Sequence, residues 1–175
     1  MCANEIETNA KKMVAAGKGI LAADESDGTI KKRFDLINVP STEENRRSYR
    51  EMLFTAKNIE EHISGVILFD ETIRQKTKDG IPFAELLTSL GIVPGIKVDK
   101  GAKPLAGAPG ETVTEGLDGL RDRLAEYYEL GARFTKWRSV INIGNGLPTK
   151  YAIDTNAHAL ARFAALSQEA NLVPI

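Results

Sequence analysis

Five short apolar runs, separated by longer amphipathic stretches, constrain the fold of this chain more than any other sequence feature. Each run is rich in aliphatic or β-branched residues and is bounded by turn residues, which is typical of strands buried in a parallel sheet. Successive runs lie roughly 30 to 45 residues apart, the length of one strand–helix–strand unit with its right-handed crossover. This order predicts an α/β protein with a parallel sheet. The runs span residues 19–24, 65–70, 92–99, 134–143 and 171–175.

The amphipathic stretches between the runs predict helices. Ser41 and Glu44 have the spacing of a capping box, which predicts a helix that begins there and runs to about Lys57. Pro82 is expected in the first turn of another helix, where its missing N–H costs little. A polar loop is expected over residues 111–115. The predicted helices cover residues 4–16, 41–57, 81–90, 117–130 and 155–170.

Ionic side chains occupy one face of two predicted strands. Because side chains alternate across a strand, Lys97 and Asp99 share one face of the third strand, and Lys136 and Arg138 share one face of the fourth. The opposite faces are apolar and suit packing against helices. An isolated buried charge costs on the order of tens of kcal/mol in the Born limit. These ionic groups must therefore pair with one another or meet water and ligand at one mouth of the fold.

A barrel supplies such a mouth, because the C-terminal ends of all its strands converge there. We therefore predict a (β/α)8 TIM barrel rather than an open sheet. A whole barrel needs about 250 residues and eight units, and this chain carries only about four and a half. Residues 1–175 are expected to form the N-terminal half of a single barrel domain with no internal boundary. Since a half-barrel exposes two strand edges and an apolar interior, we expect a continuation or a second piece.

The composition excludes several classes of function. The 175 residues hold 23 Lys and Arg against 24 Asp and Glu, a net charge of -1, which lacks the basic excess that nucleic acids or anionic membranes attract. No apolar run approaches bilayer-spanning length, and the polar N-terminus does not have the features of a signal peptide. Cys2 has no partner for an internal disulfide, and His62 and His158 lack metal-ligand spacing. We expect a cytosolic protein that binds neither nucleic acid nor membrane and uses no metal.

Seven motifs occur in register from about Lys12 to the last residue. They read GKGILAADES, STEENRR, GVILFDET, GIKVDKG, PLAG, GLDGL and KWR. Together they resemble class I fructose-1,6-bisphosphate aldolases. The resemblance implies a TIM barrel that cleaves fructose 1,6-bisphosphate reversibly to dihydroxyacetone phosphate and glyceraldehyde 3-phosphate. It implies chemistry through a lysine Schiff base, with no metal and no cofactor, in a homotetramer.

The resemblance also implies roles for individual residues. Asp24 matches the aspartate that assists carbinolamine formation and carbon–carbon cleavage, and Lys136 matches the lysine that contacts substrate and assists proton transfers. Lys97 and Arg138 match substrate-binding cations of the active site. A sugar bisphosphate carries two dianions, so its binding requires cations that present N–H donors. Further substrate contacts are implied at Ser26, Thr29, Arg33 and Arg46.

Other interpretations stay open for several of these residues. Lys97 and Asp99 also fit an internal structural ion pair, and Arg33 and Arg46 also fit ordinary charges on a helix surface. Asp27 stands where many relatives carry a small polar residue, and it adds a negative charge near the expected phosphate loop.

In the family, the Schiff-base lysine, an acidic pair and the second phosphate site all lie beyond the position of Ile175. An alternative function is therefore a catalytically incomplete half-barrel that only binds sugar phosphates or complements a second half. A different sugar-phosphate barrel enzyme is a weaker alternative. The preference between fructose 1,6-bisphosphate and fructose 1-phosphate stays open.

Overall fold

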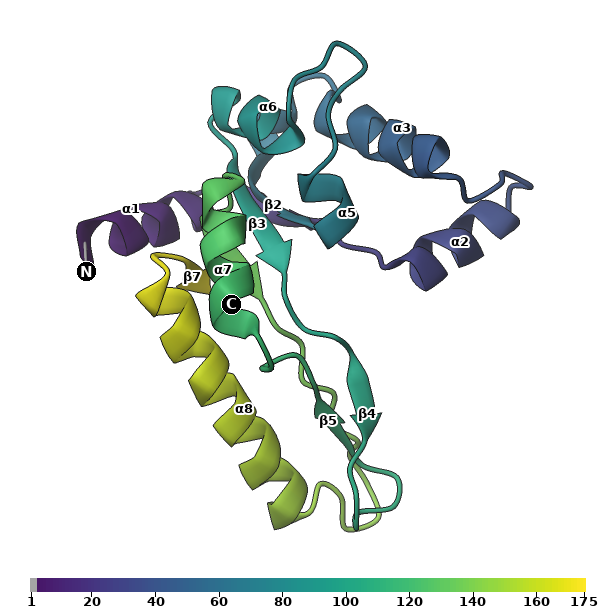
Figure 1. Ribbon diagram of the computed structural model, residues 1–175, viewed down its shortest axis with the longest axis vertical. Helices are drawn as coiled ribbons and strands as arrows, with labels where there is room; N and C mark the ends of the chain where they lie inside the picture. Colours follow the sequence, from purple (N-terminus) through teal and green to yellow (C-terminus); the bar gives the residue numbers. More distant parts are fainter. Residues whose placement is uncertain (1–2) are drawn as a thin grey trace.

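Each of the five apolar runs overlaps one strand, and these strands pair in parallel in one sheet in the order β1-β2-β3-β6-β7. Strand β2 begins two residues before the predicted run 65–70. The computed structural model describes residues 3–175, so Cys2 lies outside the described residues. Helices α6, α7 and α8 lie along one side of the sheet. Helices α2 and α3 lie together at the right of Figure 1, away from α1 and α8. The strands are β1 (Gly19–Ala22), β2 (Ile63–Leu68), β3 (Val93–Lys97), β6 (Phe134–Lys136) and β7 (Val173–Pro174).

Each of the five predicted helices is present, although their ends differ from those predicted. Short helices α2, α4 and α5 were not predicted. Among residues 3–175, no helix is both long enough and apolar enough to cross a bilayer. The helices are α1 (Ala3–Met13), α2 (Asp27–Asp35), α3 (Glu43–Phe54), α4 (Ile59–His62), α5 (Asp70–Ile73), α6 (Phe83–Ser89), α7 (Leu120–Glu129) and α8 (Lys150–Glu169).

Capping interactions explain where two of the helices begin. Thr42, not Ser41, caps α3, because its side-chain oxygen accepts a hydrogen bond from the Asn45 N–H at 3.2 Å. Thr149 caps α8 in the same way through the Ala152 N–H, so α8 begins before the predicted residue 155. Both corrections arise because the sequence offers more than one hydroxyl or start point, and only the backbone path selects between them.

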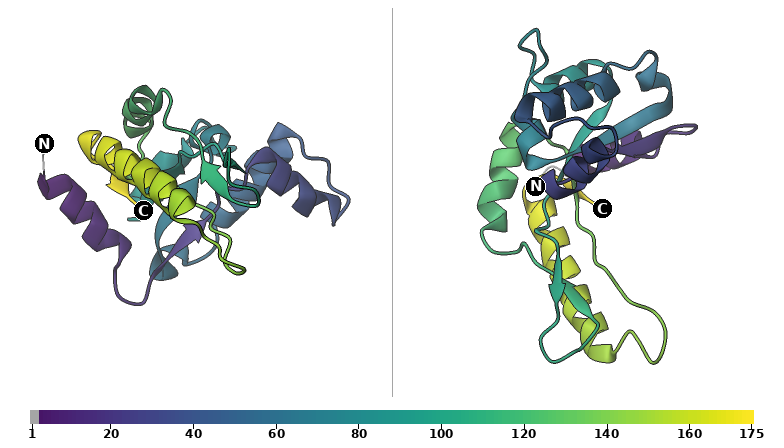
Figure 2. Two further views of the ribbon diagram at one scale, coloured as in Figure 1. Left: turned by 90° about the horizontal axis from the view of Figure 1, so that it is seen from below. Right: turned by 90° about the vertical axis from the view of Figure 1, so that its right-hand side faces the viewer.

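Two predictions between β3 and α8 are wrong, one about a loop and one about the length of a strand. Strands β4 (Ala102–Pro104) and β5 (Thr112–Thr114) pair in antiparallel fashion, so the predicted polar loop over residues 111–115 is wrong. The predicted strand over residues 134–143 is also too long, because the chain leaves the sheet after Lys136 and runs beside the hairpin. There the Thr114 hydroxyl donates to the carbonyl of Arg138 at 2.8 Å. The hairpin lies alongside α8 (Figure 2).

The outer face of the sheet packs against the helices, as the alternation of strand residues predicted. Ile96, Val98 and Trp137 are buried in one apolar cluster with side chains of the surrounding helices. The Trp137 ring packs against Phe163 of α8, with ring centroids 5.4 Å apart. Because burial of each large apolar side chain contributes about 1.5–3 kcal/mol, this layer holds the helices to the sheet.

The inner face of the sheet carries a smaller apolar cluster built around Phe134. A Cβ added to Gly95 would lie 2.2 Å from Cζ of the Phe134 ring, and one added to Gly65 would lie 3.3 Å from Cε1. The ring therefore lies directly over two glycines on neighbouring strands. The other buried members of the cluster are Met13, Ile67, Val93 and Val173.

The position of this ring also fixes the direction of two lysines. Lys97 lies two residues beyond Gly95, and Lys136 lies two residues beyond Phe134, so both lysines point to the inner face. Their Cα positions are partners in the pairing of β3 with β6. The predicted placement of Lys97 and Lys136 on the face opposite Ile96, Val98 and Trp137 is therefore confirmed.

Replacing Gly95 with alanine should destabilise the sheet. The new methyl group would overlap the Phe134 ring, and overpacking of this kind costs about 1–3 kcal/mol. Gly19→Ala is the matched control, because a Cβ on Gly19 meets nothing within 4 Å. Urea unfolding measures both variants, and a G95A chain no less stable than G19A would contradict the described packing.

Candidate active site

The carboxyl ends of β1, β3 and β6 open into one cavity of about 900 Å³, within the size range of small-molecule sites. The cavity also reaches the first turns of α2 and one side of α7. Seven of the eight predicted site residues line it, and Arg46 does not. These seven are Asp24, Ser26, Thr29, Arg33, Lys97, Lys136 and Arg138.

Asp24 and Lys136 meet inside the cavity although 112 positions separate them in sequence. Lys136 Nζ donates a hydrogen bond to Asp24 Oδ2 at 2.7 Å. The Asp24 side chain is 9% exposed and that of Lys136 is 26% exposed, so solvent screens the pair only in part. A charge-assisted contact of this kind is stronger than a neutral one, and it holds a carboxylate and an ammonium group together within the cavity.

Lys97 has its own carboxylate partner. Its Nζ donates to Asp99 Oδ1 at 2.7 Å and to the Asp99 carbonyl at 3.0 Å. Asp99 Oδ1 also accepts from the Gly101 N–H at 3.0 Å. The internal ion pair weighed as an alternative for Lys97 is thus present. Because the pair lines the cavity, it does not remove Lys97 from a ligand's reach.

Two hydroxyl groups lie at the start of α2. Ser26 Oγ and Thr29 Oγ1 are 3.2 Å apart, and Ser26 sits at the N-cap without a side-chain capping bond. Free N–H groups and the helix dipole favour anions at such a terminus. Arg33, from the last turn of α2, donates to the carboxylate of Glu25 and contacts the Tyr49 hydroxyl at 3.3 Å. Its side chain is 55% exposed, so it is still open to a ligand.

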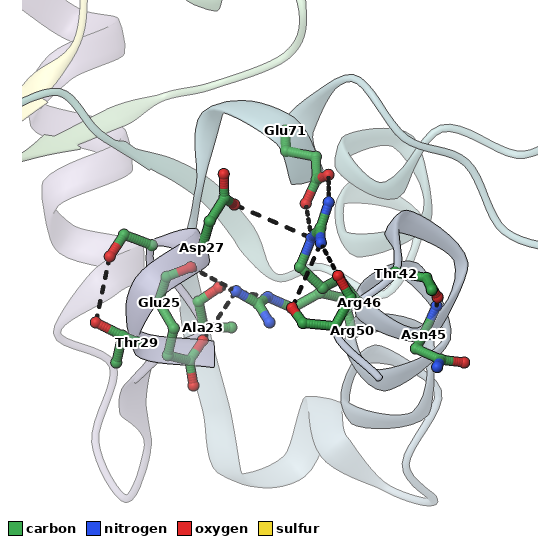
Figure 3. A network of polar contacts seen from close by, with 11 residues as sticks. Ala23, Glu25, Asp27, Thr29, Thr42, Asn45, Arg46, Arg50 and Glu71 are labelled. Atoms are coloured by element: carbon green, nitrogen blue, oxygen red, sulfur yellow. Dashed lines mark hydrogen bonds and ion pairs between the residues drawn. The ribbon is translucent and has the colours of Figure 1, made fainter. Parts of the chain in front are cut away.

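Arg46 lies outside the cavity and makes a structural contact. Figure 3 shows its guanidinium between Asp27 and Glu71. It donates to Glu71 Oε2 at 2.8 Å and to Oε1 at 2.5 Å, and its Nε lies 4.0 Å from Asp27 Oδ1. The hydrogen bonds to Glu71 raise the pKa of Arg46 above its ordinary value. Arg46 therefore joins α3 to α5, and its contact with substrate stays a prediction.

A buried ion pair next to Asp24 was not predicted from the sequence. Glu25 and Arg50 are both buried, and Arg50 Nη2 lies 3.0 Å from Glu25 Oε2. Glu25 is adjacent to a predicted catalytic residue, so its position in the motif was a usable signal. Arg50 had none, because it is one of three arginines on a helix that also carries several glutamates.

A second group that was not predicted lies on the α5 and α7 side of the cavity. Tyr127 donates its hydroxyl to Asp70 Oδ1 at 2.8 Å, and Arg74 Nη2 donates to the same oxygen at 2.9 Å. Partial burial alone would raise the pKa of Asp70. Hydrogen bonds from Arg74 and Tyr127, with the charges of Arg74 and Arg123, hold the pKa below its ordinary value. Burial, followed by the bond to Asp70, raises the pKa of Tyr127.

The cavity holds more basic than acidic side chains. Within residues 3–175, the side chains of Lys100 and Arg138 have no hydrogen-bond or ion-pair partner. Unpaired cations that line a cavity favour anionic ligands. The basic side chains are Arg33, Arg74, Lys97, Lys100, Arg123, Lys136 and Arg138, and the acidic ones are Asp24, Glu25, Asp70, Asp99 and Glu126.

Metal-ligating side chains do not gather in the part of the chain that the structure describes. There, no three His, Cys, Asp or Glu residues lie close enough together to hold a metal ion. The expectation of chemistry without a metal stays a prediction.

Residues 5–175 match the sequence family described as "Fructose-bisphosphate aldolase class-I". The chain belongs to this family. A protein of Xanthomonas axonopodis named "Probable fructose-bisphosphate aldolase class 1" is 63% identical over 175 residues, which is 100% of this chain and 52% of that protein. The Arabidopsis thaliana protein "Fructose-bisphosphate aldolase 6, cytosolic" is 57% identical over 173 residues, 99% of this chain and 48% of that one.

A solved aldolase structure extends the similarity to three dimensions. It is a fructose-bisphosphate aldolase from Plasmodium falciparum, in complex with TRAP and a small-molecule inhibitor. The TM-score is 0.95 at 52% identity, over 98% of this chain and 50% of that one. The predicted class I aldolase membership and the predicted first half of a TIM barrel are therefore confirmed. The chain spans about half the length of the curated aldolases it matches.

Asp70→Asn should change how the stability of the chain depends on pH. An unfolded aspartate has a pKa of about 3.9, and the pKa of folded Asp70 is lower. Its ionised form therefore contributes stability that is fully present above about pH 4 and is lost as the pH falls through the folded value.

The measurement is the difference in free energy of unfolding between the wild type and D70N, from urea titrations. The difference should be constant from about pH 7 to pH 5 and should shrink between about pH 4 and pH 2. A difference that stays constant down to about pH 2, or grows there, would contradict the described hydrogen bonds.

Proposed function

We propose that this chain supplies one half of the active site of a fructose-bisphosphate aldolase. The reaction is the reversible cleavage of fructose 1,6-bisphosphate to dihydroxyacetone phosphate and glyceraldehyde 3-phosphate. One observation carries the proposal: Asp24 contacts Lys136 in a cavity that also contains two cations without partners in residues 3–175. Membership of the class I aldolase family supports the choice of reaction.

Asp24 and Lys136 move protons in this proposal. Cleavage breaks a carbon–carbon bond of the sugar, and the hydroxyl on the leaving carbon must lose its proton as the aldehyde forms. An ionised carboxylate can accept a proton, and the ammonium group beside it can pass one on. The bonding electrons move into a Schiff base on a lysine, which the family pattern locates beyond residue 175. Neither Lys97 nor Lys136 takes that role.

Five further predicted site residues in the cavity bind a phosphate group of the substrate in this proposal. Lys97 and Arg138 provide charge, and the Ser26 and Thr29 hydroxyls at the start of α2 provide neutral donors. Arg33 reaches the same cavity from the end of α2. Such a mixed set suits a dianion, because charge attracts it and the fixed hydroxyls orient it.

The finer properties of the family extend this proposal. The active protein is a cytoplasmic homotetramer that acts in glycolysis and gluconeogenesis and uses neither metal nor cofactor. Relatives named as cytosolic support the location. The second candidate function is a half-barrel that binds sugar phosphates without cleaving them, and the cations that line the cavity support such binding.

Borohydride trapping separates the two candidates. The chain is incubated with fructose 1,6-bisphosphate and borohydride, alone and after co-expression with the remaining half of the Xanthomonas relative. The aldolase proposal expects an adduct and cleavage only in the second case, with the adduct on the added half. Binding without any adduct or cleavage in either case supports the binding half-barrel instead, and an adduct on Lys97 or Lys136 contradicts both.

Substitutions in the complemented enzyme should divide by role. Asp24→Ala should lower kcat about a hundredfold or more, because proton transfer loses its base. Lys97→Met and Arg138→Met should mainly raise KM, since they remove charge that binds phosphate. Steady-state kinetics measure all three, with Lys150→Met as the control because Lys150 is exposed, pairs with Asp154 on the surface of α8 and does not line the cavity. Unchanged kinetics in all three variants would remove the site assignment.

A further inference from the structure

Arg50 binds the backbone on both sides of Asp24. Beyond the end of β1, the Ala23 carbonyl accepts a hydrogen bond from Arg50 Nε at 2.8 Å, and the Glu25 carbonyl accepts one from Arg50 Nη2 at 3.0 Å. Figure 3 shows the Arg50 guanidinium directed at Ala23 and Glu25. One rigid planar group therefore holds two carbonyls that flank a single residue.

This contact is made in a buried place. Arg50 is 2% exposed, and the Glu25 carboxylate is its ion-pair partner at 3.0 Å. Burial lowers the pKa of Arg50, and the charge of Glu25 opposes that change. Arg50 Nη1 is also buried without a hydrogen-bond partner among the described residues. A buried pair of this kind is weak evidence for stability, because an apolar residue of the same size packs at lower cost.

The position of the Arg50 guanidinium instead suits it to hold the backbone around Asp24. Asp24 lies two residues beyond Ala22, the last residue of β1, and its carboxylate must reach Lys136, which lies three strands away in the sheet order. Ala23 still donates to the Ile67 carbonyl at 3.1 Å, but Asp24 itself lies past the end of β1. The Ala23 carbonyl belongs to the peptide plane directly before Asp24, and the Glu25 carbonyl belongs to the second plane after it. The two hydrogen bonds therefore restrain the short backbone segment that contains Asp24.

We propose that Arg50 is a positioning residue that holds the Asp24 carboxylate against Lys136 through the backbone on either side of Asp24. The role of this contact in catalysis rests on the proposed aldolase function, whereas the positioning itself does not. Lysine cannot replace Arg50 fully, because a single ammonium group does not present the two-pronged donor that meets both carbonyls.

The test is a double-mutant cycle on the reactivity of Lys136. Wild type, R50K, D24N and D24N/R50K are treated briefly with an N-hydroxysuccinimide ester of acetate, and mass spectrometry gives the acetylation rate of Lys136 relative to Lys150. A lysine held in an ion pair is acylated slowly. We expect R50K to raise the relative rate about threefold to tenfold, and D24N to raise it at least as much. On the D24N background, R50K should have no further effect.

Arg47→Lys is the matched control, because Arg47 lies on the same helix and is ion-paired with Glu44 and Glu51 but does not touch residues 23–25. It should leave Lys136 reactivity unchanged. Equal effects of R50K on both backgrounds, or no effect on either, would overturn the proposal, because a merely structural role does not depend on Asp24. If R50K unfolds, the cycle is repeated with R50Q, and loss of the fold in both variants also overturns it.

The complemented enzyme separates this proposal from the proposed function. There, R50K should lower kcat about tenfold with little change in KM, and should have no effect in D24N. A normal labelling cycle in a protein that never cleaves substrate would leave the positioning role intact and refute the aldolase function. Cleavage with independent effects of R50K and D24N would do the reverse.

Discussion

Two lysines placed side by side constrain everything else at the mouth of this sheet. Lys97 and Lys136 are partners in the pairing of β3 with β6. Residues two apart on a strand share a face, so both lysines lie on the inner face with Gly95 and the Phe134 ring. Like charges on adjacent strands repel, so each needs a carboxylate of its own. Asp99 serves Lys97 at 2.7 Å, and Asp24 serves Lys136 at 2.7 Å. The hydrogen bond from Lys136 to Asp24 joins the segment after β1 to the end of β6.

This arrangement explains how a chain of near-zero net charge can keep cationic side chains in one cavity. The charges are balanced overall but segregated locally, and the cavity keeps an excess of cations after the internal pairs are formed. Side chains outside the group of cavity cations support it: buried Arg50 holds the backbone beside Asp24, and partly buried Arg46 joins α3 to α5 through Glu71. These residues thus divide into those that line the cavity and those that hold the first set in position.

The inner face of the sheet could be predicted from sequence, because alternation along a strand is a local property. The spacing of Lys97 and Asp99, and of Lys136 and Arg138, is enough to assign each pair to one face. Contacts between distant segments could not be predicted in that way. Arg50 lies on a helix of ordinary charged residues, and only the path of the chain after β1 brings two carbonyls to it. The hairpin after β3 was missed because its two strands have three residues each.

We propose that ionic side chains from the ends of β1, β3 and β6 form one site for a phosphorylated sugar. The most direct test of this claim is an NMR titration of the isotope-labelled chain with fructose 1,6-bisphosphate. For a single site, amide signals of residues 24–29, 97–101 and 136–138 should move together and fit one dissociation constant. Changes confined to one of these segments, or different constants for each, would contradict the claim.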